Sequence, residues 1–382
     1  SLSFSTGQQV VNRPYQETSS RVSGSEIISS NSKTSYNGNY GLNASWTLYN
    51  GNKRLKTIQQ EKLNNQVAEL DVATSENNIQ ESIAQVYIQI LYAAESVKVN
   101  ESTLQVSIAQ RDRGQELLNA GSIAKSDFAQ LEAQVSTDRY QLVTAQATLE
   151  DYKLQLKQLL ELDGENEMNI YLPALSDENV LAPLPTKKDV YISALSLRPE
   201  IEASKLNVEA SELGIGIAKS SYLPTISLSA GIGTNHTSGS DFTFGEQVKN
   251  GWNNSIGLSV SVPIFNNRQT KSAVQKAKLQ YETSMLSLLD EQKTLYKTIE
   301  GLWLDANSAQ QRYAAANEKL KSTQISYELI SEQFNLGMKN TIELLTEKNN
   351  LLQAQQEQLQ AKYMAILNTQ LLKFYQGDQL AI

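Results

Sequence analysis

The stretch Gly41-Leu-Asn-Ala-Ser-Trp-Thr-Leu-Tyr-Asn50 recurs 216 residues later as Gly257-Leu-Ser-Val-Ser-Val-Pro-Ile-Phe-Asn266. At the same offset, Gly121 recurs as Gly337. Internal repetition decides the architecture of a chain, so it is the first property to interpret. The unit here is about 200 residues long, whereas solenoid repeats take about 20–50 residues. We therefore predict two halves of one pseudo-symmetric body.

Four segments, beginning near residues 2, 40, 226 and 256, alternate apolar and polar residues as half-buried strands do. Their polar positions carry Ser, Gly, Asn and Thr, with hardly a charge. In a transmembrane barrel the aliphatic face meets lipid and the small polar face lines water, whereas a soluble β-sandwich would bury the aliphatic face. On the barrel interpretation, the lipid-facing residues are Leu42, Trp46, Leu48, Ile226, Leu228, Leu258, Val260 and Val262. Aromatic residues at or near the segment ends, as in an interfacial girdle, are Phe4, Tyr36, Trp46, Tyr49, Trp252 and Phe265.

A helical pattern of about 70 residues without proline follows each second strand, over 51–120 and 267–336. At 1.5 Å per residue, each helix would be roughly 100 Å long, about three times the hydrocarbon thickness of a bilayer. Apolar residues recur every seven positions, which indicates left-handed coiled-coil packing. Shorter helices return over about 124–160 and 340–374. Each half is therefore predicted to be two strands followed by a long antiparallel helical hairpin.

The second half has one helical segment that the first half lacks, running from Thr186 to Tyr222. It would complete the shorter side of the helical layer, so we expect the natural protein to carry a matching helix upstream of residue 1. The linker from Leu162 to Pro185 is predicted to run around the helical body. The predicted organisation is a strand hairpin (1–50), a long helical hairpin (51–161), a linker (162–186), a helix (187–222), a second strand hairpin (223–266), a second long helical hairpin (267–374) and a C-terminal tail (375–382).

The composition argues against most chemistry. There is no cysteine and a single histidine, so nucleophilic Cys/His catalysis and His/Cys metal sites are excluded, and we predict no enzyme and no cofactor. The net charge of −8 and the absence of a Lys/Arg run argue against a nucleic-acid partner. His236 lies in a polar stretch, so we expect an exposed loop residue. Gly214 and Gly216 lie inside a helical pattern and indicate close helix packing rather than a nucleotide fingerprint.

Several motifs follow one another at characteristic spacing: Arg198-Pro199-Glu200-Ile201, the run Tyr222-Leu-Pro-Thr-Ile-Ser-Leu-Ser229, and the hairpin turns 118–127 and 334–343. With them, nearly the whole chain resembles the TolC-type outer-membrane efflux proteins, or outer membrane factors. The resemblance implies a mixed α+β membrane protein: a homotrimer with one 12-stranded β-barrel in outer-membrane lipid and a 12-helix α-barrel in the periplasm. It further implies an exit duct for a tripartite efflux pump or type I secretion system. The duct is closed at its periplasmic tip and opened by docking of a periplasmic adaptor (membrane fusion protein) and an inner-membrane transporter.

The strand count supports oligomerisation independently of the resemblance. Four strands cannot close a membrane barrel, because even the smallest single-chain barrels need about eight. Open sheet edges are not tolerated in lipid, so several subunits must pool their strands. The number three comes from the resemblance alone.

Asp127 and Glu343 occupy equivalent positions just after the two helical turns. In a trimer they would form a ring of six carboxylates that attracts cations at the narrow end. The other interpretation is that each is an acid at a helix N-terminus, favoured by the helix dipole, with Ser126 or Thr341 as the cap. The two interpretations are compatible.

The resemblance also assigns roles near the tips. The family's pore-narrowing aspartate corresponds here to Thr346, and Gln130 is its counterpart in the first half, so a cation-selective constriction would move to Glu343. Lys339 falls where the family places a basic residue that holds the tip shut, although a solvated lysine is the simpler interpretation. The adaptor-docking candidates are Gly121, Ser122, Ile123, Gly337, Met338 and Asn340.

An alternative of a different class is a soluble or surface structural coiled-coil fibre or adhesin with a small β head. In that protein the aliphatic strand faces would be buried in the core of the head. It predicts solubility without detergent and needs no upstream helix.

Overall fold

The computed structural model describes residues 1–15, 19–23, 26–30, 33–162, 170–171, 180–240 and 242–380. The chain forms two compact units, Ser1–Asn65 with Leu206–Met285 and Gln66–Lys205 with Leu286–Ile382. The elements, in chain order, are β1 (Leu2–Asn12), β2 (Ser19–Ser23), β3 (Glu26–Ser30), β4 (Thr34–Asn50), α1 (Lys53–Asn119), α2 (Lys125–Leu159), α3 (Lys187–Leu197), α4 (Pro199–Ser220), β5 (Thr225–Thr237), α5 (Phe244–Asn250), β6 (Asn253–Ser261), α6 (Gln269–Asn335) and α7 (Thr341–Gln376).

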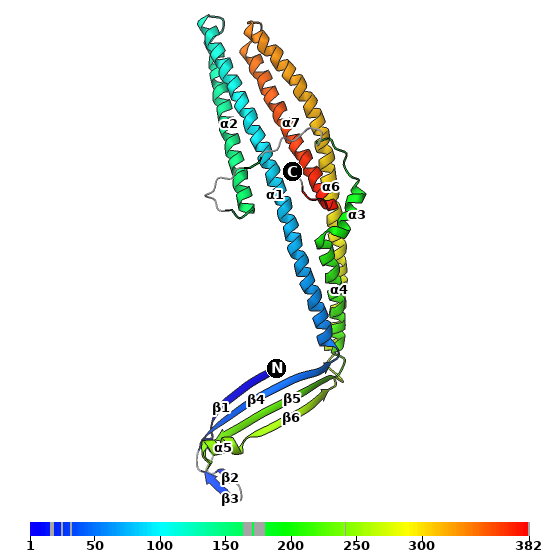
Figure 1. Ribbon diagram of the computed structural model, residues 1–382. Coiled ribbons are helices and arrows are strands. Elements are labelled where there is room, and N and C mark those ends of the chain that lie inside the picture. Colours follow the sequence, from blue (N-terminus) through cyan, green and yellow to red (C-terminus); the bar gives the residue numbers. More distant parts are fainter. Residues whose placement is uncertain are drawn as a thin grey trace. The chain divides into compact units, whose positions relative to one another are not determined.

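The four predicted strands form one antiparallel sheet in the first unit, in the order β1-β4-β5-β6 (Figure 1). The strand pairs of the two halves are β1–β4 and β5–β6. They meet at the β4–β5 ladder, where Trp46 lies opposite Leu228. One assignment was wrong: β6 ends at Ser261, so Val262 lies beyond the strand. Pro263 follows directly, and it has no N–H with which to continue a ladder.

Two short elements lie in the polar connections between the strands of the sheet. Strands β2 and β3 pair as a small antiparallel sheet. Helix α5 opens with a capping box in which Thr243 accepts from the backbone N–H of Glu246, and the Glu246 carboxylate accepts from the N–H of Thr243 at 2.8 Å. The Thr-x-x-Glu spacing is a sequence signal for a helix start, so this helix was visible in the sequence.

His236 was predicted to be an exposed loop residue, and this was wrong. It lies in β5, which extends to Thr237, and its side chain is half-buried. Its ring lies 5.1 Å from that of Phe244 on α5 and 6.0 Å from that of Tyr40 on β4. The alternation that marks the first half of β5 fades into polar residues here, so the strand looked shorter in the sequence than it is.

Both strand-to-helix junctions use the same unusual backbone. Gly51 and Asn52 have φ of 67° and 64°, and their counterparts Asn267 and Arg268 have φ of 50° and 61°. This left-handed conformation is disfavoured for residues with a side chain. At Gly51 a Cβ would also lie 2.8 Å from the carbonyl oxygen of Ser220, so glycine is required there.

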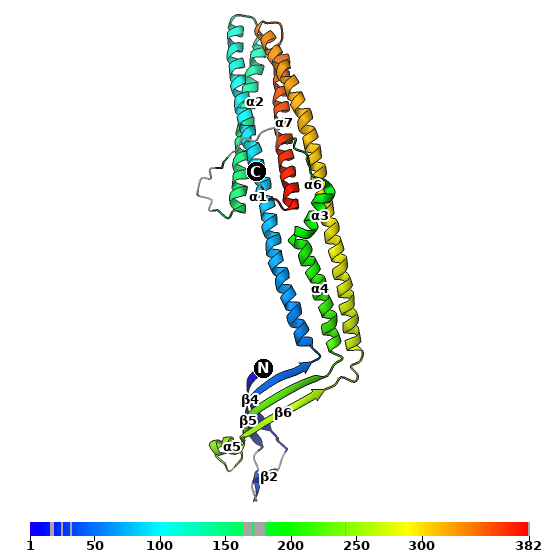
Figure 2. The same cartoon turned by 45° about the vertical axis from the view of Figure 1, so that its right-hand side comes forward.

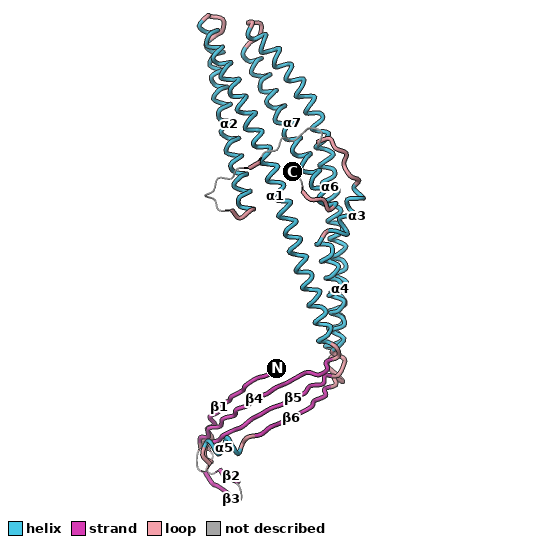
Figure 3. The backbone as a smooth tube through the Cα atoms, in the orientation of Figure 1, coloured by secondary structure: helices cyan, strands magenta, loops and turns pink. Residues whose placement is uncertain are grey.

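The two outgoing helices are the same length. Helices α1 and α6 each have 67 residues, and both begin and end at an offset of 216. Helices α2 and α7 return with 35 and 36 residues. Figures 1 and 2 show α2 beside α1 and α7 beside α6, and Figure 3 shows each pair joined by a short turn. The repeated hairpin predicted from the sequence is therefore present in both halves.

The single helix predicted over 187–222 was wrong, because the structure has two helices separated at Arg198. Arg198 has extended backbone angles (φ −75°, ψ 123°), and Pro199 begins α4. A proline inside a helix removes a hydrogen bond and clashes with the preceding turn, and it pushes the residue before it out of the helical region. The start at Thr186 is as predicted, since its side chain accepts from the N–H of Asp189.

The break places Arg198 at a junction of three elements in the second unit. Its side chain is 6% exposed and lies 3.0 Å from the carboxylate of Glu81 on α1. The guanidinium also lies over the ring of Tyr375, 3.6 Å from its centroid. An arginine can pair with a carboxylate and stack on an aromatic face at the same time. Arg198 thus ties the end of α3 to α1 and α7.

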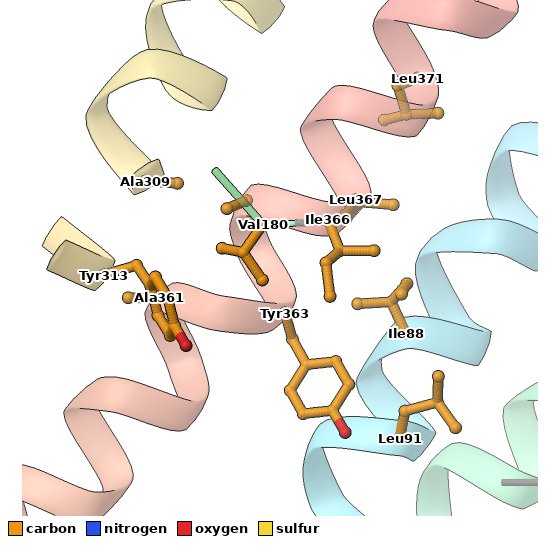
Figure 4. Close-up of a cluster of buried hydrophobic side chains, with 11 residues drawn as sticks. Ile88, Leu91, Val180, Ala309, Tyr313, Ala361, Tyr363, Ile366, Leu367 and Leu371 are labelled. Atoms are coloured by element: carbon orange, nitrogen blue, oxygen red, sulfur yellow. The ribbon is translucent and has the colours of Figure 1, made fainter. Parts of the chain in front are cut away.

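The hydrophobic core of the second unit is arranged around α7. One cluster joins Ile88 and Leu91 of α1, Tyr313 of α6 and Ile366 of α7, with Val180 from the linker (Figure 4). A second cluster joins α3, α4, α6 and α7. Ile299, Ala306 and Tyr313, which follow one another at seven-residue spacing along α6, are all buried. A Leu or Ile side chain at such a position contributes about 1.5–3 kcal/mol through burial.

The end of the linker lies along α6. The side chain of Gln310 donates to the carbonyl oxygens of Val180 and Ala182 at 2.9 and 2.8 Å, and the Trp303 indole donates to Pro185 at 3.0 Å. Most of the linker lies outside the described residues, so the prediction that it runs around the helical body stays a prediction.

Candidate functional site

The sheet presents two chemically different faces because successive strand residues point to opposite sides. Cross-strand register places Leu2 opposite Ala44, Ala44 opposite Ala230 and Ala230 opposite Ile256, so aliphatic residues from all four strands share one face. In the protomer most of this face is uncovered: Trp46 is 61% and Leu258 64% exposed. The other predicted lipid-facing strand residues, Leu42, Leu48, Ile226, Leu228 and Val260, are exposed or half-buried. A continuous apolar face of this size marks an interaction surface.

The opposite face of the sheet carries small, polar and uncharged side chains. The hydroxyl groups of Ser229, Ser255 and Ser259 donate to carbonyl oxygens of the neighbouring strand at 3.3–3.4 Å. Each hydroxyl is thereby satisfied by the sheet itself. The face offers weak hydrogen-bonding groups and no ionic site.

The sheet also has two open edges. Strand β1 pairs only with β4, and β6 pairs only with β5, within the described residues. Unpaired N–H and C=O groups along an edge can pair with another strand. Both edges of the sheet are therefore available for pairing with further strands.

The two helical turns have the same geometry. Gly121 (φ 71°) donates to the carbonyl of Leu118 at 2.9 Å, and Ser122 donates to Leu117 at 2.8 Å. The second turn repeats this pattern with Gly337 (φ 76°), whose N–H donates to Phe334, and Met338, whose N–H donates to Gln333. This is the Schellman ending of a helix, which needs a left-handed residue that glycine supplies without strain.

Asp127 and Glu343 bind the N-terminal end of their own helices. In α7, Asn340 accepts from the N–H of Glu343 at 2.9 Å, and Glu343 accepts from the N–H of Asn340 at 3.2 Å. In α2, Asp127 accepts from the N–H of Ala124 at 3.4 Å, but Ala124 has no side-chain acceptor to return the bond. The helix-acid interpretation of both residues is therefore realised within the protomer.

The predicted caps, Ser126 and Thr341, were wrong, because Ala124 and Asn340 hold these positions. A cap residue has extended backbone angles, as Asn340 does (φ −92°, ψ 166°). Ser126 and Thr341 already lie inside the helices.

Lys339 bonds to its own hairpin in the protomer. Its Nζ lies 2.6 Å from Oε1 of Glu343. The hydrogen bond from Lys339, followed by that from the Asn340 backbone, lowers the pKa of the Glu343 carboxyl. Thr346 is exposed, and its hydroxyl donates to the carbonyl of Ile342 at 2.8 Å.

The surfaces of the two turns differ. Around Gly337, the side chains of Leu336, Met338 and Ile342 are all more than 60% exposed. Around Gly121, Ser122 is exposed and Ile123 is half-buried. The second turn is thus an apolar protrusion. It was not predicted, although apolar residues in a turn are visible in the sequence.

A buried polar link, also not predicted, joins the two hairpins. Lys348 on α7 bonds to Asp138 on α2, and it lies 2.5 Å from the hydroxyl of Ser107 on α1. The side chains of Lys348 and Asp138 are 3% and 1% exposed. Burial lowers the pKa of Lys348, and the hydrogen bond to Asp138 partly offsets this. The available signal was a lysine between the buried positions Leu344 and Leu351.

A second polar contact lies between the outgoing helices. The side chain of Gln110 on α1 donates to the hydroxyl of Tyr327 on α6 at 2.8 Å. Burial raises the pKa of Tyr327. Two contacts therefore join the hairpins: α1 bonds to α6 through Gln110 and Tyr327, and α2 bonds to α7 through Asp138 and Lys348.

The described helices of the second unit line several cavities, and two of them are of similar size. One, of about 540 Å³, is lined by uncharged polar side chains of α1, α2 and α7, including Asn100, Tyr140 and Gln353. The other, also of about 540 Å³, lies between α6 and α7 beside the Lys319–Glu357 ion pair. Among the described residues, no group of three or more His, Asp or Glu side chains converges as a metal site. No described helix carries a stretch long and apolar enough to cross a membrane.

The sequence profile of the family described as Outer membrane efflux protein matches residues 11–161 and 190–377. The outer membrane efflux protein BepC of Brucella suis biovar 1 (strain 1330) is 24% identical over 294 residues, which are 76% of this chain and 61% of BepC. The outer membrane protein TolC of Escherichia coli (strain K12) is 23% identical over 311 residues, 79% of this chain and 62% of TolC. The chain thus spans about three fifths of the length of these relatives.

The fold is also similar to that of a solved channel structure. A crystal structure of CusC superposes with a TM-score of 0.79 at 18% identity, covering 99% of this chain and 84% of CusC. At that identity the likeness shows the fold, which is mixed α and β and mostly helical.

Proposed function

Because the chain belongs to the outer membrane efflux protein family, as a TolC-type outer membrane factor, we propose that it forms a passive exit duct in the bacterial outer membrane. The duct serves a tripartite efflux pump or a type I secretion system. It binds its cargo weakly and carries out no catalysis. Energy for export comes from an inner-membrane transporter.

The four-stranded sheet is the observation that supports this proposal most directly. It has four strands, an aliphatic face that is largely uncovered, and two open edges. Four strands are too few to close a barrel in lipid, and edges must be paired there. Three copies that pool their strands form a 12-stranded β-barrel, with the aliphatic face toward lipid and the serine-rich face toward a water-filled lumen.

The helices of the three copies form a 12-helix α-barrel in the periplasm. Helices of 67 residues are about 100 Å long, which exceeds the thickness of the bilayer several-fold. In this arrangement 1–50 and 223–266 supply the β-barrel, 51–161, 187–222 and 267–374 supply the helical barrel, and 162–186 and 375–382 form its equatorial belt.

At the tip of the α-barrel, Asp127 and Glu343 of three copies form a ring of six carboxylates. Capping a helix does not remove their negative charge, so the ring attracts cations. Thr346 and Gln130 contribute no charge to the constriction, which leaves Glu343 as its acid. Lys339 exchanges Glu343 for a partner on a neighbouring hairpin and so holds the tip shut.

The helical turns form the docking surface for a periplasmic adaptor. Helix-in-groove recognition uses apolar anchors on exposed helices. The exposed side chains of Leu336, Met338 and Ile342 supply such anchors. Gly121, Ser122, Ile123, Gly337 and Asn340 shape the remaining surface. Docking of the adaptor and the transporter opens the tip.

Single-channel conductance in a planar bilayer tests the proposal. The purified oligomer is compared with Glu343→Gln and with the control Glu318→Gln, which removes an equally charged, exposed side chain away from the turns. We expect a small cation-selective conductance whose selectivity falls in Glu343→Gln and is unchanged in Glu318→Gln. Protein that stays soluble without detergent and forms no channels would overturn the duct and favour a coiled-coil fibre.

A further inference from the structure

Helix α5 lies on the aliphatic face of the sheet and not on its polar face. Thr234 and His236 of β5 lie two and four residues beyond Ile232, so they share the face of the aliphatic residues. The hydroxyl of Thr234 donates to the carbonyl of Val248 at 2.7 Å. The ring of Phe244 packs at 5.1 Å against that of His236. The connection between β5 and β6 therefore folds onto the side that, in the proposed duct, faces lipid.

The surface around α5 is aromatic and includes a lysine. Phe242, Phe244 and Trp252 are 45%, 56% and 57% exposed. Lys249 is also exposed, whereas the carboxylate of Glu246 is bonded to Thr243 at the start of the helix. Aromatic rings and lysines of this kind are enriched where acyl chains meet headgroups.

The two tryptophans of the sheet are close enough to lie within one apolar band of a bilayer. Asn253 is in register with Gly233, which places Trp252 level with Thr234, while Trp46 is in register with Leu228, six residues away along β5. At about 3.3 Å per residue, the two tryptophans are separated by about 20 Å along the strand, which is about 15 Å of height in a barrel whose strands are tilted by about 35–45°. The residues between them on this face include Ile232 and Ile256. The apolar band of an outer-membrane barrel is about 25 Å tall and has aromatic residues at both borders.

We propose that α5, with Phe242, Phe244 and Trp252, is an interfacial anchor. It inserts at the boundary between headgroups and acyl chains in the outer leaflet, on the outside of the barrel. This inference rests on the proposed function, because it requires the aliphatic face to meet lipid. It assigns the β5–β6 connection a lipid partner, so this connection neither covers the lumen nor extends freely into the medium.

The three tryptophans of the chain allow a direct test, because each reports a different place. The full-length oligomer is reconstituted into phosphatidylcholine vesicles whose acyl chains are brominated either near the headgroup or near the chain end. Variants with a single tryptophan are Trp46→Phe/Trp303→Phe, which keeps Trp252, and Trp252→Phe/Trp303→Phe, which keeps Trp46. The variant Trp46→Phe/Trp252→Phe keeps Trp303 on α6 as the control.

We expect bromine near the headgroup to quench Trp252 fluorescence at least twofold more than bromine near the chain end, while Trp303 is not quenched. Quenching of Trp46 without quenching of Trp252 would overturn the anchor and leave the lipid-facing sheet in place. If neither Trp46 nor Trp252 is quenched in protein whose circular dichroism is native, the proposed function itself fails. Every substitution exchanges one aromatic residue for another, so we expect the variants to fold. Circular dichroism detects any variant that does not.

Discussion

The ammonium group of Lys348 on α7 bonds to the carboxylate of Asp138 on α2, and both side chains are at most 3% exposed. The two residues are 210 positions apart and belong to different hairpins. Removing two charges from water is costly, and the attraction between them repays it only when the geometry is good and the remaining polar atoms are bonded. Ser107 and Gln134 supply such bonds to Asp138, at 2.5 and 2.9 Å. The pair therefore favours one arrangement of the two hairpins.

Breaking this pair on one side should be strongly destabilising. In Lys348→Met the carboxylate of Asp138 stays buried without its partner, and we expect a loss of about 3–5 kcal/mol in the free energy of unfolding. The double variant Lys348→Met/Asp138→Leu should recover most of that loss, since neither charge remains. Urea unfolding followed by circular dichroism measures both. The control is Lys319→Met at an exposed ion pair with Glu357, where we expect less than about 1 kcal/mol. Additive losses in the double variant would refute the coupling.

Alkaline pH should destabilise the second unit through Tyr363. Burial, with a contribution from the charge on Glu95, raises the pKa of its hydroxyl from 10.0 to about 12. The folded state therefore holds the proton more tightly than the unfolded state. The associated stability is fully present below pH 10 and is lost as the pH rises toward 12, on the order of 2–3 kcal/mol. In Tyr363→Phe the unfolding midpoint should fall less steeply over this range. A parallel pH profile in wild type and variant would contradict the assignment.

The two helical turns should respond alike to alanine. Gly121 and Gly337 have positive φ, and a Cβ added at either residue would have no other atom within 4 Å. The effect of Gly121→Ala or Gly337→Ala is therefore conformational, and we expect a loss of about 1–2 kcal/mol for each. The matched control is Gly301→Ala in the interior of α6, where there is equal space and no positive φ. That variant should gain about 0.5–1 kcal/mol. Thermal unfolding of all three variants separates the cost of a left-handed backbone from the cost of steric crowding by the added Cβ.

The helix caps differ between the two copies, and exchanging them should have opposite effects. Asn340→Ala removes the acceptor for the N–H of Glu343 and should cost about 1 kcal/mol. Ala124→Asn adds the missing acceptor at the start of α2 and should gain a similar amount. Both are read from the midpoint of chemical unfolding. No gain at position 124 would mean that the first turn cannot adopt the capping geometry.

The two strand-to-helix junctions also differ in which substitutions they tolerate. Gly51→Ala would bring a Cβ within 2.8 Å of the Ser220 carbonyl in a left-handed conformation, and we expect a loss of more than about 2 kcal/mol. At the equivalent junction, Arg268→Gly relieves a residue with φ of 61°, and we expect a gain of about 1 kcal/mol. Thermal unfolding of the reconstituted protein measures both effects. A loss of stability in Arg268→Gly would show that its side chain contributes more than its backbone costs.

Patterns that repeat along the chain predicted the elements well. Alternation identified the four strands of the sheet, and the offset of 216 identified both helical turns. These signals are local, because period two and period seven reflect which side of a strand or helix is buried. The prediction failed where one residue interrupted an otherwise continuous helical pattern. Pro199 was visible in the sequence, yet one helix was predicted across it.

Residues whose role depends on a distant partner could not be found in this way. His236 looked like a loop residue because its neighbours along the chain are polar, while its actual neighbours are Tyr40 and Phe244. Lys348 was not singled out, although it lies between the apolar residues Leu344 and Leu351. Its burial depends on Asp138 and Ser107, which lie on two other helices.

The sequence by itself determined the order of the four sheet strands and the two helical hairpins, the twofold repeat, the two faces of each strand and the lengths of the hairpin helices. These properties follow from interactions between residues a few positions apart, which are encoded in periodicity and in glycine and proline placement. Tertiary structure decided which face α5 covers, where Arg198 is stacked and which charges are buried together. Such contacts join segments up to 241 residues apart, as Ser107 and Lys348 are, and only the packing of whole helices and strands brings them together.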